Sequence, residues 1–528
     1  MKRLLASLWL LAAPAAFADP APAPSPNAPK CEALRFADLA ATPDAPTKIM
    51  EAALAPAKGE LPEACVVRGY VAPQVGIEML LPTERWNGKL IEIGSGGFAG
   101  TLFGGGCEDS LRRGYACVHS DQGHTAATSD KAAAPLDGLW AYQNPQAELD
   151  YAFRSVHVVT LAARAIAQQY YAAPARKNYF FGCSNGGRQA MVAAQRYPRD
   201  FDGVLAMEPA MNLSGAFLTF LYGYKTVTDS DGKPLFASTD LDLLHRSAVE
   251  ACDAGDGLKD GIVGDPRRCK FDPAKLACVA GQKEGCLSPE QVTAAKRMYA
   301  GPVDSKGHAL YRGHVMPGAE RGVFGFGVTK PVAALALQDF FRYLAFVPDA
   351  GPAAKLSDFD MDRDPPRLAT MEALYEASNP DLRAFKESGG KLLMVQGWDD
   401  SGTPFPLNTI DYYETMQRTM GGAKNTRDFA RLFMVPGREH CVGGDGATAA
   451  DYFGALETWV EQGRAPEQIR AAHLKAAGEM GDYFREPRDP AAAAFTRPLY
   501  PYPLAARYRG KGDANDWQSF APVDTSAP

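Results

Sequence analysis

The stretch FGCSNGGRQAM, residues Phe181–Met191, joins an apolar segment to a helix-forming one. It contains the pattern Gly-x-Ser-x-Gly, with Ser184 at its centre. A nucleophilic serine on a sharp strand-to-helix turn needs small residues two positions to either side, because the turn brings backbone segments close together and exposes the hydroxyl. An ordinary strand-to-helix turn can carry the same short pattern. The predicted strand before it and the predicted helix after it favour the nucleophile.

Strand-like and helix-like segments alternate around this turn. Residues 66–72, 89–97 and 177–184 are short apolar runs typical of strands, whereas residues 148–171 and 186–198 repeat apolar side chains at the helical period. The alternation stops after about residue 210 and returns at the stretch GGKLLMVQGWDD. This pattern predicts an α/β fold with a mainly parallel sheet, helices on both faces and a long insertion.

The N-terminus has the features of an export signal. Lys2 and Arg3 precede the apolar run Leu4–Leu11, and Ala16-Phe17-Ala18 matches a cleavage site. The following Pro/Ala-rich residues are expected to be extended and unpacked. The predicted parts are a signal peptide at 1–18, a spacer at 19–30, a catalytic domain split between 31–210 and 387–528, and an insertion at 211–386.

Composition restricts the partners and the compartment. The net charge of -7 and the absence of a long basic run exclude a nucleic-acid-binding surface. Beyond the signal no stretch approaches about 18 consecutive apolar residues, so we expect an exported protein, periplasmic or secreted, with no membrane segment. In an oxidising compartment the ten cysteines are expected to form disulfides. The lack of a Cys-x-x-Cys pair argues against zinc.

A serine nucleophile needs a base and an orienting carboxylate, which follow in the order Ser, Asp/Glu, His in this kind of fold. Asp399 and Asp400 end an apolar run after the insertion, and His440 lies in a loop after the next one. The remaining histidines lie in predicted helices, in the insertion, in a late charged segment or before the serine, and are expected to be structural.

Cys183 precedes Ser184 directly, and Cys441 follows His440 directly. A bond between these two cysteines would hold the nucleophile against its base, although two separate structural disulfides would also satisfy the pattern. The loop IGSGGFAG, residues Ile93–Gly100, is expected to supply an oxyanion donor, because its glycines let the backbone approach a substrate closely. A phosphate loop would need GxxxxGK[ST], which is absent.

The segment CDAGDGLKDGIVGDP places Asp253, Asp256 and Asp260 among glycines. Clustered carboxylates suit a hard cation such as Ca²⁺, and the carbonyls of Leu258 and Ile262 could complete the shell. A solvated acidic turn is the alternative. Such a metal would be structural, and no organic cofactor is expected.

The stretches GCSNGGRQAM, CDAGDGLKDGIV, GWDDSG, PGREHC and RPLYPYPLAARYRGKGDANDWQSF together resemble the tannase and feruloyl esterase family, which includes the mono(2-hydroxyethyl) terephthalate hydrolases. The resemblance covers nearly the whole mature chain. It implies an α/β-hydrolase core, with a mainly parallel doubly wound sheet, and an inserted lid domain that binds Ca²⁺. It also implies Ser184 as nucleophile, His440 as base, Asp400 as orienting acid, and the amides of Asn185 and Gly97 as oxyanion donors.

The resemblance further implies the pairing of Cys183 with Cys441. The remaining cysteines are then expected to pair as Cys31–Cys65, Cys107–Cys117, Cys252–Cys269 and Cys278–Cys286. Tyr500 stands where family members often have a cysteine, so Cys107–Cys117 is expected to be a substitute bridge. The implied activity is hydrolysis of small esters of aromatic acids, feruloyl-esterase-like, with a tannase or a terephthalate monoester hydrolase as alternatives. A non-catalytic Ca²⁺-dependent binding protein is a remote alternative, since it would not need the complete triad.

Overall fold

The computed structural model describes residues 25–526 apart from 103, 131–132, 323–324, 403–404, 477, 479 and 488. The predicted signal peptide therefore lies outside the described residues. The prediction of an extended spacer up to residue 30 was wrong at the C-terminal end of that spacer, because residues Ala28–Glu32 form the helix α1. The side chains of Ser25 and Asn27 both donate hydrogen bonds to Glu63, which anchors this segment to the core.

A nine-stranded sheet forms the centre of the molecule, in the order β1-β2-β3-β5-β4-β6-β7-β8-β9. Neighbours from β5 to β9 in this order are parallel, whereas the pairs β1–β2, β2–β3 and β3–β5 are antiparallel. The strands are β1 Thr47–Ala55, β2 Ala64–Val71, β3 Val75–Pro82, β4 Lys89–Ile93, β5 Ala116–Ser120, β6 Lys177–Cys183, β7 Gly203–Met207, β8 Lys391–Gly397 and β9 Ala430–Val435. The predicted mainly parallel α/β sheet is confirmed, with an antiparallel edge.

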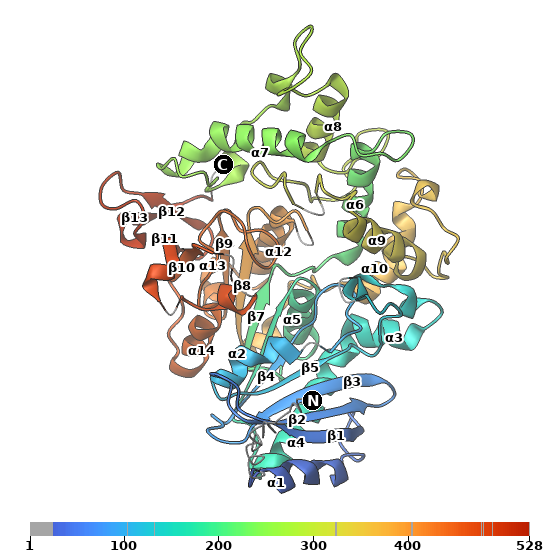
Figure 1. Cartoon of the computed structure of the whole chain (residues 1–528), viewed down its shortest axis with the longest axis vertical. Coiled ribbons are helices and arrows are strands. Elements are labelled where there is room, and N and C mark those ends of the chain that lie inside the picture. Colours follow the sequence, from blue (N-terminus) through green and yellow to red (C-terminus); the bar gives the residue numbers. More distant parts are fainter. Residues whose placement is uncertain are drawn as a thin grey trace, which may run out of the picture.

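Helices cover both faces of the parallel strands (Figure 1). Along β8, Leu392 and Met394 pack with helices α5 (Asn185–Arg196) and α12 (Pro406–Thr419), whereas Leu393 and Val395 pack with α14 (Tyr452–Gln462). Successive side chains of a strand point to opposite faces, so a strand buried on both sides must be apolar throughout. The other core helices are α2 Glu108–Arg112, α3 Pro145–Leu149, α4 Ser155–Tyr171 and α13 Ala423–Arg427.

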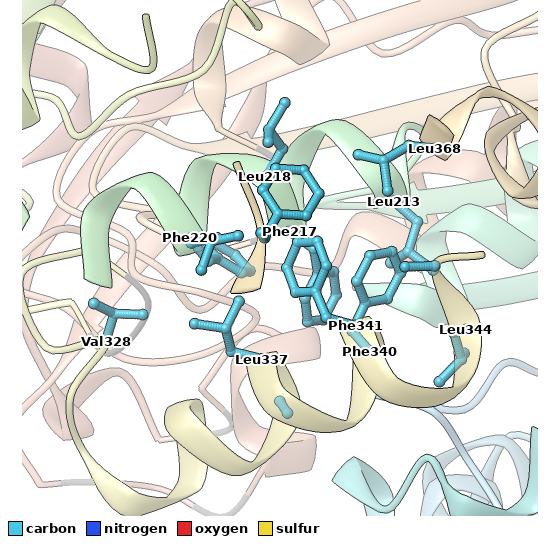
Figure 2. Packing of buried hydrophobic residues seen from close by; sticks show 14 of the residues in the cluster. Leu213, Phe217, Leu218, Phe220, Val328, Leu337, Phe340, Phe341, Leu344 and Leu368 are labelled. Carbon is cyan, nitrogen blue, oxygen red and sulfur yellow. The ribbon is translucent and has the colours of Figure 1, made fainter. Parts of the chain in front are cut away.

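The chain between β7 and β8 leaves the sheet and returns to the neighbouring strand position. Its helices are α6 Leu213–Val227, α7 Ser238–Cys252, α8 Pro289–Ala300, α9 Pro331–Asp339, α10 Ala369–Tyr375 and α11 Arg383–Glu387. In Figure 1, α6 to α9 lie beyond the end of the sheet. Figure 2 shows leucine, valine and phenylalanine side chains packed together in this region; among them, the rings of Phe217 on α6 and Phe340, just after α9, stack with centroids 4.1 Å apart. We call residues 208–390 the lid segment; the exact domain boundaries stay a prediction.

Two small two-stranded sheets follow the core near the C-terminus. β10 (Ile469–Leu474) pairs with β11 (Ala493–Leu499), and β12 (Leu504–Tyr508) pairs with β13 (Phe520–Asp524), both antiparallel. Among the residues that the structure describes, no helix is both long and apolar enough to span a bilayer.

All ten cysteines are paired in five disulfides, and the pairs are the expected ones: Cys31–Cys65, Cys107–Cys117, Cys183–Cys441, Cys252–Cys269 and Cys278–Cys286. Four of them close loops of 8 to 34 residues. Cys183–Cys441 spans 258 residues and joins the two halves of the core.

Arg188 on α5 is fully buried and connects the core to the lid segment. Its guanidinium donates to the carbonyls of Tyr151 and Ala152, both 2.7 Å away, and to the carbonyl of Tyr375 on α10 at 3.3 Å. Residues Asp150–Arg154 form a widened, π-helical turn between α3 and α4, and this turn supplies the first two carbonyls. The guanidinium of Arg188 thus supplies donors to two carbonyls of this widened turn.

Replacing Arg188 with Leu should lower the free energy of unfolding by roughly 3 kcal/mol, because several buried carbonyls would lose their donor. Chemical denaturation of the variant measures this loss. Arg199→Leu, at an exposed position just after α5, is the matched control and should change stability by less than about 0.5 kcal/mol. Equal stabilities for the two variants would contradict the role given to Arg188.

Candidate active site

Ser184 lies on the sharp turn between β6 and α5, with a left-handed backbone of φ 64° and ψ -123°. Such a conformation is costly for a residue with a side chain and is kept only where the surroundings enforce it. The flanking glycines make the turn possible: a Cβ on Gly182 would lie 2.4 Å from the carbonyl of Gly186, and one on Gly94 would lie 2.7 Å from the Cα of Gly186. The Gly-x-Ser-x-Gly pattern is thus required by backbone contact.

The structure brings Ser184, His440 and Asp400 into one hydrogen-bonded chain. Nε2 of His440 lies 2.8 Å from Oγ of Ser184, and Nδ1 lies 2.9 Å from Oδ2 of Asp400. Asp400 is fully buried, and its Oδ1 accepts a hydrogen bond from the amide of Gly402 at 2.7 Å. With Nδ1–H donated to the carboxylate, Nε2 is left to accept the serine proton.

The structure shows which of two adjacent aspartates contacts the histidine, a choice that the residue pattern alone did not make. Asp400 contacts His440, whereas the charged groups that act on Asp399 are the carboxylates of Glu320, Glu439 and Asp445. Burial and these neighbouring charges raise the pKa of Asp399 well above its usual value.

The charge on His440 is governed by two opposing effects. Burial disfavours the imidazolium, but the carboxylate of Asp400 outweighs this effect and raises the pKa of His440. About a quarter of the imidazole side chain, 27%, is exposed, so a substrate can reach it. The group can therefore act as a base that takes a proton from Ser184 and keeps it during bond formation.

Two charged neighbours of the site escaped the sequence analysis. Glu208 directly follows β7, and Arg438 lies three residues beyond β9; their side chains form an ion pair with 2.7 Å between Nε and Oε1. The amide of Cys441 donates to Oε2 of Glu208. The only local signal for Glu208 is its place at the carboxyl end of a buried strand, the edge where α/β folds gather their functional groups.

The loop after β4 lies against the start of α5, as expected for an oxyanion hole. Gly97 has φ 60°, and a Cβ there would lie 2.0 Å from the carbonyl of Pro135. Pro135 also accepts a hydrogen bond from Phe98, and the amide side chain of Asn185 donates to the carbonyl of Ser95 at 3.1 Å. The loop is thereby fixed beside Asn185, although the donor roles of the Gly97 and Asn185 amides stay a prediction.

The acidic loop in the lid segment is held by its own backbone. The carboxylate of Asp253 accepts from the amides of Asp260 and Gly261, and Asp256 accepts from the amide of Leu258. Asp260 also pairs with Arg497 at 2.6 Å. Burial, together with the charges of Asp260 and Asp253, raises the pKa of Asp256 to about 6. The oxygen donors fit a hard cation in their chemistry, while Arg497 neutralises part of the charge.

Among the described residues, two groups of three metal-ligating side chains have ligand atoms within 4.8 Å of one another: Cys183, Glu208 and Cys441, and Glu208, Asp400 and His440. Two members of the first group are joined in a disulfide, and the second is the hydrogen-bonded site itself. The carboxylates of the acidic loop do not gather this closely.

Comparison with known proteins identifies the family. The family model described as tannase and feruloyl esterase matches residues 60–523. A mono(2-hydroxyethyl) terephthalate hydrolase of Piscinibacter sakaiensis is 36% identical over 87% of this chain and 85% of its own. A probable feruloyl esterase of Arthroderma benhamiae is 33% identical over 85% and 83% of the two chains.

Solved structures show the same fold. An esterase from Aspergillus oryzae superposes with a TM-score of 0.81 at 25% identity, covering 94% of this chain and 100% of its own. Feruloyl esterase B from Aspergillus oryzae superposes with a TM-score of 0.78 at 24% identity, covering 90% and 97% of the two chains. The fold is that of an α/β-hydrolase. With a family match over most of its length, the chain belongs to the tannase and feruloyl esterase family and is a carboxylic ester hydrolase.

Proposed function

We propose that this hydrolase uses Ser184 as its nucleophile and cleaves esters of small aromatic acids, in the manner of a feruloyl esterase. The observation that carries this proposal is the chain of contacts from Ser184 through His440 to the buried Asp400, with distances of 2.8 and 2.9 Å. This is the arrangement in which an imidazole activates a serine hydroxyl.

In the first half of the reaction, Oγ of Ser184 attacks the ester carbonyl while Nε2 of His440 takes the hydroxyl proton. The carbonyl oxygen becomes an oxyanion, to which the amides of Gly97 and Asn185 would donate. The tetrahedral intermediate then collapses: the bond to the alcohol oxygen breaks, and the alcohol leaves with the proton from Nε2. An acyl-serine ester remains.

In the second half, a water molecule gives a proton to His440 and attacks the acyl carbonyl. The bond between Oγ and the acyl carbon breaks, Ser184 recovers its proton from Nε2, and the aromatic acid is released. Asp400 holds the imidazole in the tautomer that both halves require and stabilises its charged form.

The relatives support the choice of an aromatic acid, because one that is 33% identical is named a probable feruloyl esterase. Phe98, which follows Gly97 directly, stacks on Phe217 of the lid segment with centroids 5.6 Å apart, but both rings are buried in the core rather than presented to a substrate. A terephthalate monoester is the second candidate substrate, because the relative that is 36% identical carries that activity in its name. A gallate ester is the third.

The five disulfides support an exported enzyme, since such bonds persist in oxidising compartments. Together with the signal-like N-terminus, they favour the periplasm or the extracellular space. A non-catalytic binding protein is disfavoured, because it would have no need to keep the three side chains in hydrogen-bonding geometry.

Activity on a panel of esters tests the proposed function. Methyl ferulate, methyl gallate and mono(2-hydroxyethyl) terephthalate should be hydrolysed with kcat/KM at least about 100-fold above that for ethyl acetate, because burying a phenyl ring contributes several kcal/mol to binding. Ser184→Ala should lower kcat by at least about 10⁴-fold on the preferred ester. The order of the three aromatic esters decides among the candidates.

Ser155→Ala is the matched control for this experiment. Ser155 lies on α4 and is fully buried, and its hydroxyl has no hydrogen-bond partner among the described residues. The control should retain wild-type turnover. Hydrolysis by Ser184→Ala at the wild-type rate, or equal kcat/KM for aromatic and aliphatic esters, would contradict the proposal.

We also propose that Ca²⁺ binds the acidic loop through Asp253, Asp256 and Asp260, with the carbonyls of Leu258 and Ile262. The three carboxylates lie within eight residues of one another among glycines, and such a cluster of hard oxygen donors supports a Ca²⁺ site. Removal of the ion by a chelator should lower the melting temperature by about 5 °C, the shift expected for a ligand present at about 100 times its dissociation constant.

The variant Asp256→Asn distinguishes a cation site from a solvated acidic turn. An amide oxygen still accepts from Leu258, so the loop keeps its hydrogen bond. If Ca²⁺ is bound, the variant should melt lower than wild type in added Ca²⁺ and should no longer respond to the chelator. If the loop holds no ion, Asp256→Asn removes a charge that its neighbours repel, so the variant should melt at the wild-type temperature or higher. The melting temperature of the wild type should then not change when the chelator is added.

A further inference from the structure

A buried ion pair lies behind the disulfide of the active site. Glu208 and Arg438 both have side chains with 0% exposure, and 2.7 Å separates Oε1 from Nε. Burying two charges is costly even when they are paired. A pair kept in such a place therefore needs a reason other than stability.

The ion pair holds both backbone polar groups of Cys441, the residue after His440. Oε2 of Glu208 accepts the Cys441 amide proton, and Nη2 of Arg438 donates to the Cys441 carbonyl. Nη1 of Arg438 donates to the carbonyl of Thr448 at 2.8 Å, which fixes the far side of the same loop. The guanidinium thus spans the loop that carries His440.

Glu208 also touches the other half of the disulfide. Its Oε2 lies 3.1 Å from Sγ of Cys183, a contact without a hydrogen bond because a disulfide sulfur carries no proton. One carboxylate therefore contacts the residue before the nucleophile and the residue after the base.

The backbone at these positions is strained. Ser184, Glu208 and Cys441 all have left-handed φ values, of 64°, 42° and 64°. Non-glycine residues adopt this region only where surrounding contacts hold them there. Cys441 is held in it by its disulfide to Cys183 and by the hydrogen bonds that Glu208 and Arg438 make to its backbone.

We propose that Glu208 is a positioning residue of the esterase: with Arg438 it clamps the backbone of Cys441, so that His440 stays within reach of both Ser184 and Asp400. The inference rests on the proposed function of these three side chains. Glu208 does not touch the substrate. It acts through the loop it holds.

The charge of Glu208 has a second consequence. One of its oxygens, one oxygen of Asp400 and a ring nitrogen of His440 lie within 4.8 Å of one another. The charged groups that act on the imidazole are Asp400 after β8, Glu208 after β7 and Arg438 after β9. The two carboxylates favour the imidazolium, and Arg438 disfavours it. Removing the charge of Glu208 alone should therefore lower the pKa of His440 and move the acid limb of the kcat/KM profile to lower pH.

The experiment compares kcat, KM and the pH profile of wild type and three variants on the preferred aromatic ester. Glu208→Gln keeps the shape and loses the charge: we expect kcat to fall at least tenfold, KM to stay within twofold, and the acid limb to move to lower pH. Glu208→Asp keeps the negative charge but places the carboxylate farther from Cys441. We therefore expect kcat to fall while the acid limb of the pH profile stays near its wild-type position. Glu208→Gln combined with Arg438→Gln removes both charges and should move the limb less than Glu208→Gln alone.

Glu78→Gln is the matched control. Glu78 is also buried and forms an ion pair with Arg68, and His119 lies within hydrogen-bonding distance, but Glu78 lies on β3, four strands away from β7 in the sheet. This variant should lose thermal stability and keep the wild-type kcat and pH profile. Melting curves, and mass spectrometry of the intact disulfides, show that each variant is folded.

The proposal would be overturned if folded Glu208→Gln had the kcat and the pH profile of the wild type. It would also be overturned if Glu78→Gln lost as much kcat as Glu208→Gln. If Glu208→Gln does not fold, Glu208→Asp decides, and wild-type kcat in that variant would overturn the proposal. Failure of the proposed function gives a different result: turnover by the wild type would then not depend on Ser184.

Discussion

The disulfide between Cys183 and Cys441 is the constraint on which the site depends. It joins the residue before Ser184 to the residue after His440, across 258 residues of sequence. In the loop-entropy picture, closing so long a loop restricts the unfolded chain by up to about 5 kcal/mol. Its positional effect is more direct, because it keeps the two reacting side chains together although they come from separate halves of the chain.

The sheet provides the frame for this constraint. Parallel strands end at the same edge, so the residues that follow β4, β6, β7, β8 and β9 meet there even though the lid segment separates them in sequence. The sheet edge alone does not fix the position of His440, because this residue lies five residues beyond Val435, where β9 ends. A loop of this length needs fixing, and the disulfide together with the pair of Glu208 and Arg438 fixes it.

Much of this arrangement could be predicted from sequence because the signals are local. Buried parallel strands are apolar runs, and the glycines around Ser184 record a backbone contact. The edge strand β1 gave no comparable signal, since it is exposed on one face. The interior strand β3 was missed although it is buried along most of its length. The start of α1 was missed because its anchor, Glu63, lies far along the chain.

In the candidate site, too, only the features with a local sequence signal could be predicted. The order of serine, acid and base is visible in the sequence, but the pattern alone could not separate Asp399 from Asp400, because one residue decides which side of the strand end a carboxylate faces. Glu208 and Arg438 are 230 positions apart, and no local pattern marks an ion pair at such a separation. Their role is evident only when the fold brings them to one loop.

The most direct test of the catalytic account is to trap the covalent intermediate. Rapid acid quenching of the enzyme during turnover of an aromatic ester, followed by peptide mapping, should find the acyl group on the peptide that contains Ser184. It should be absent when the enzyme is quenched after the ester is exhausted. An acyl group on another residue, or turnover without any acylated peptide under conditions that accumulate one, would contradict the account.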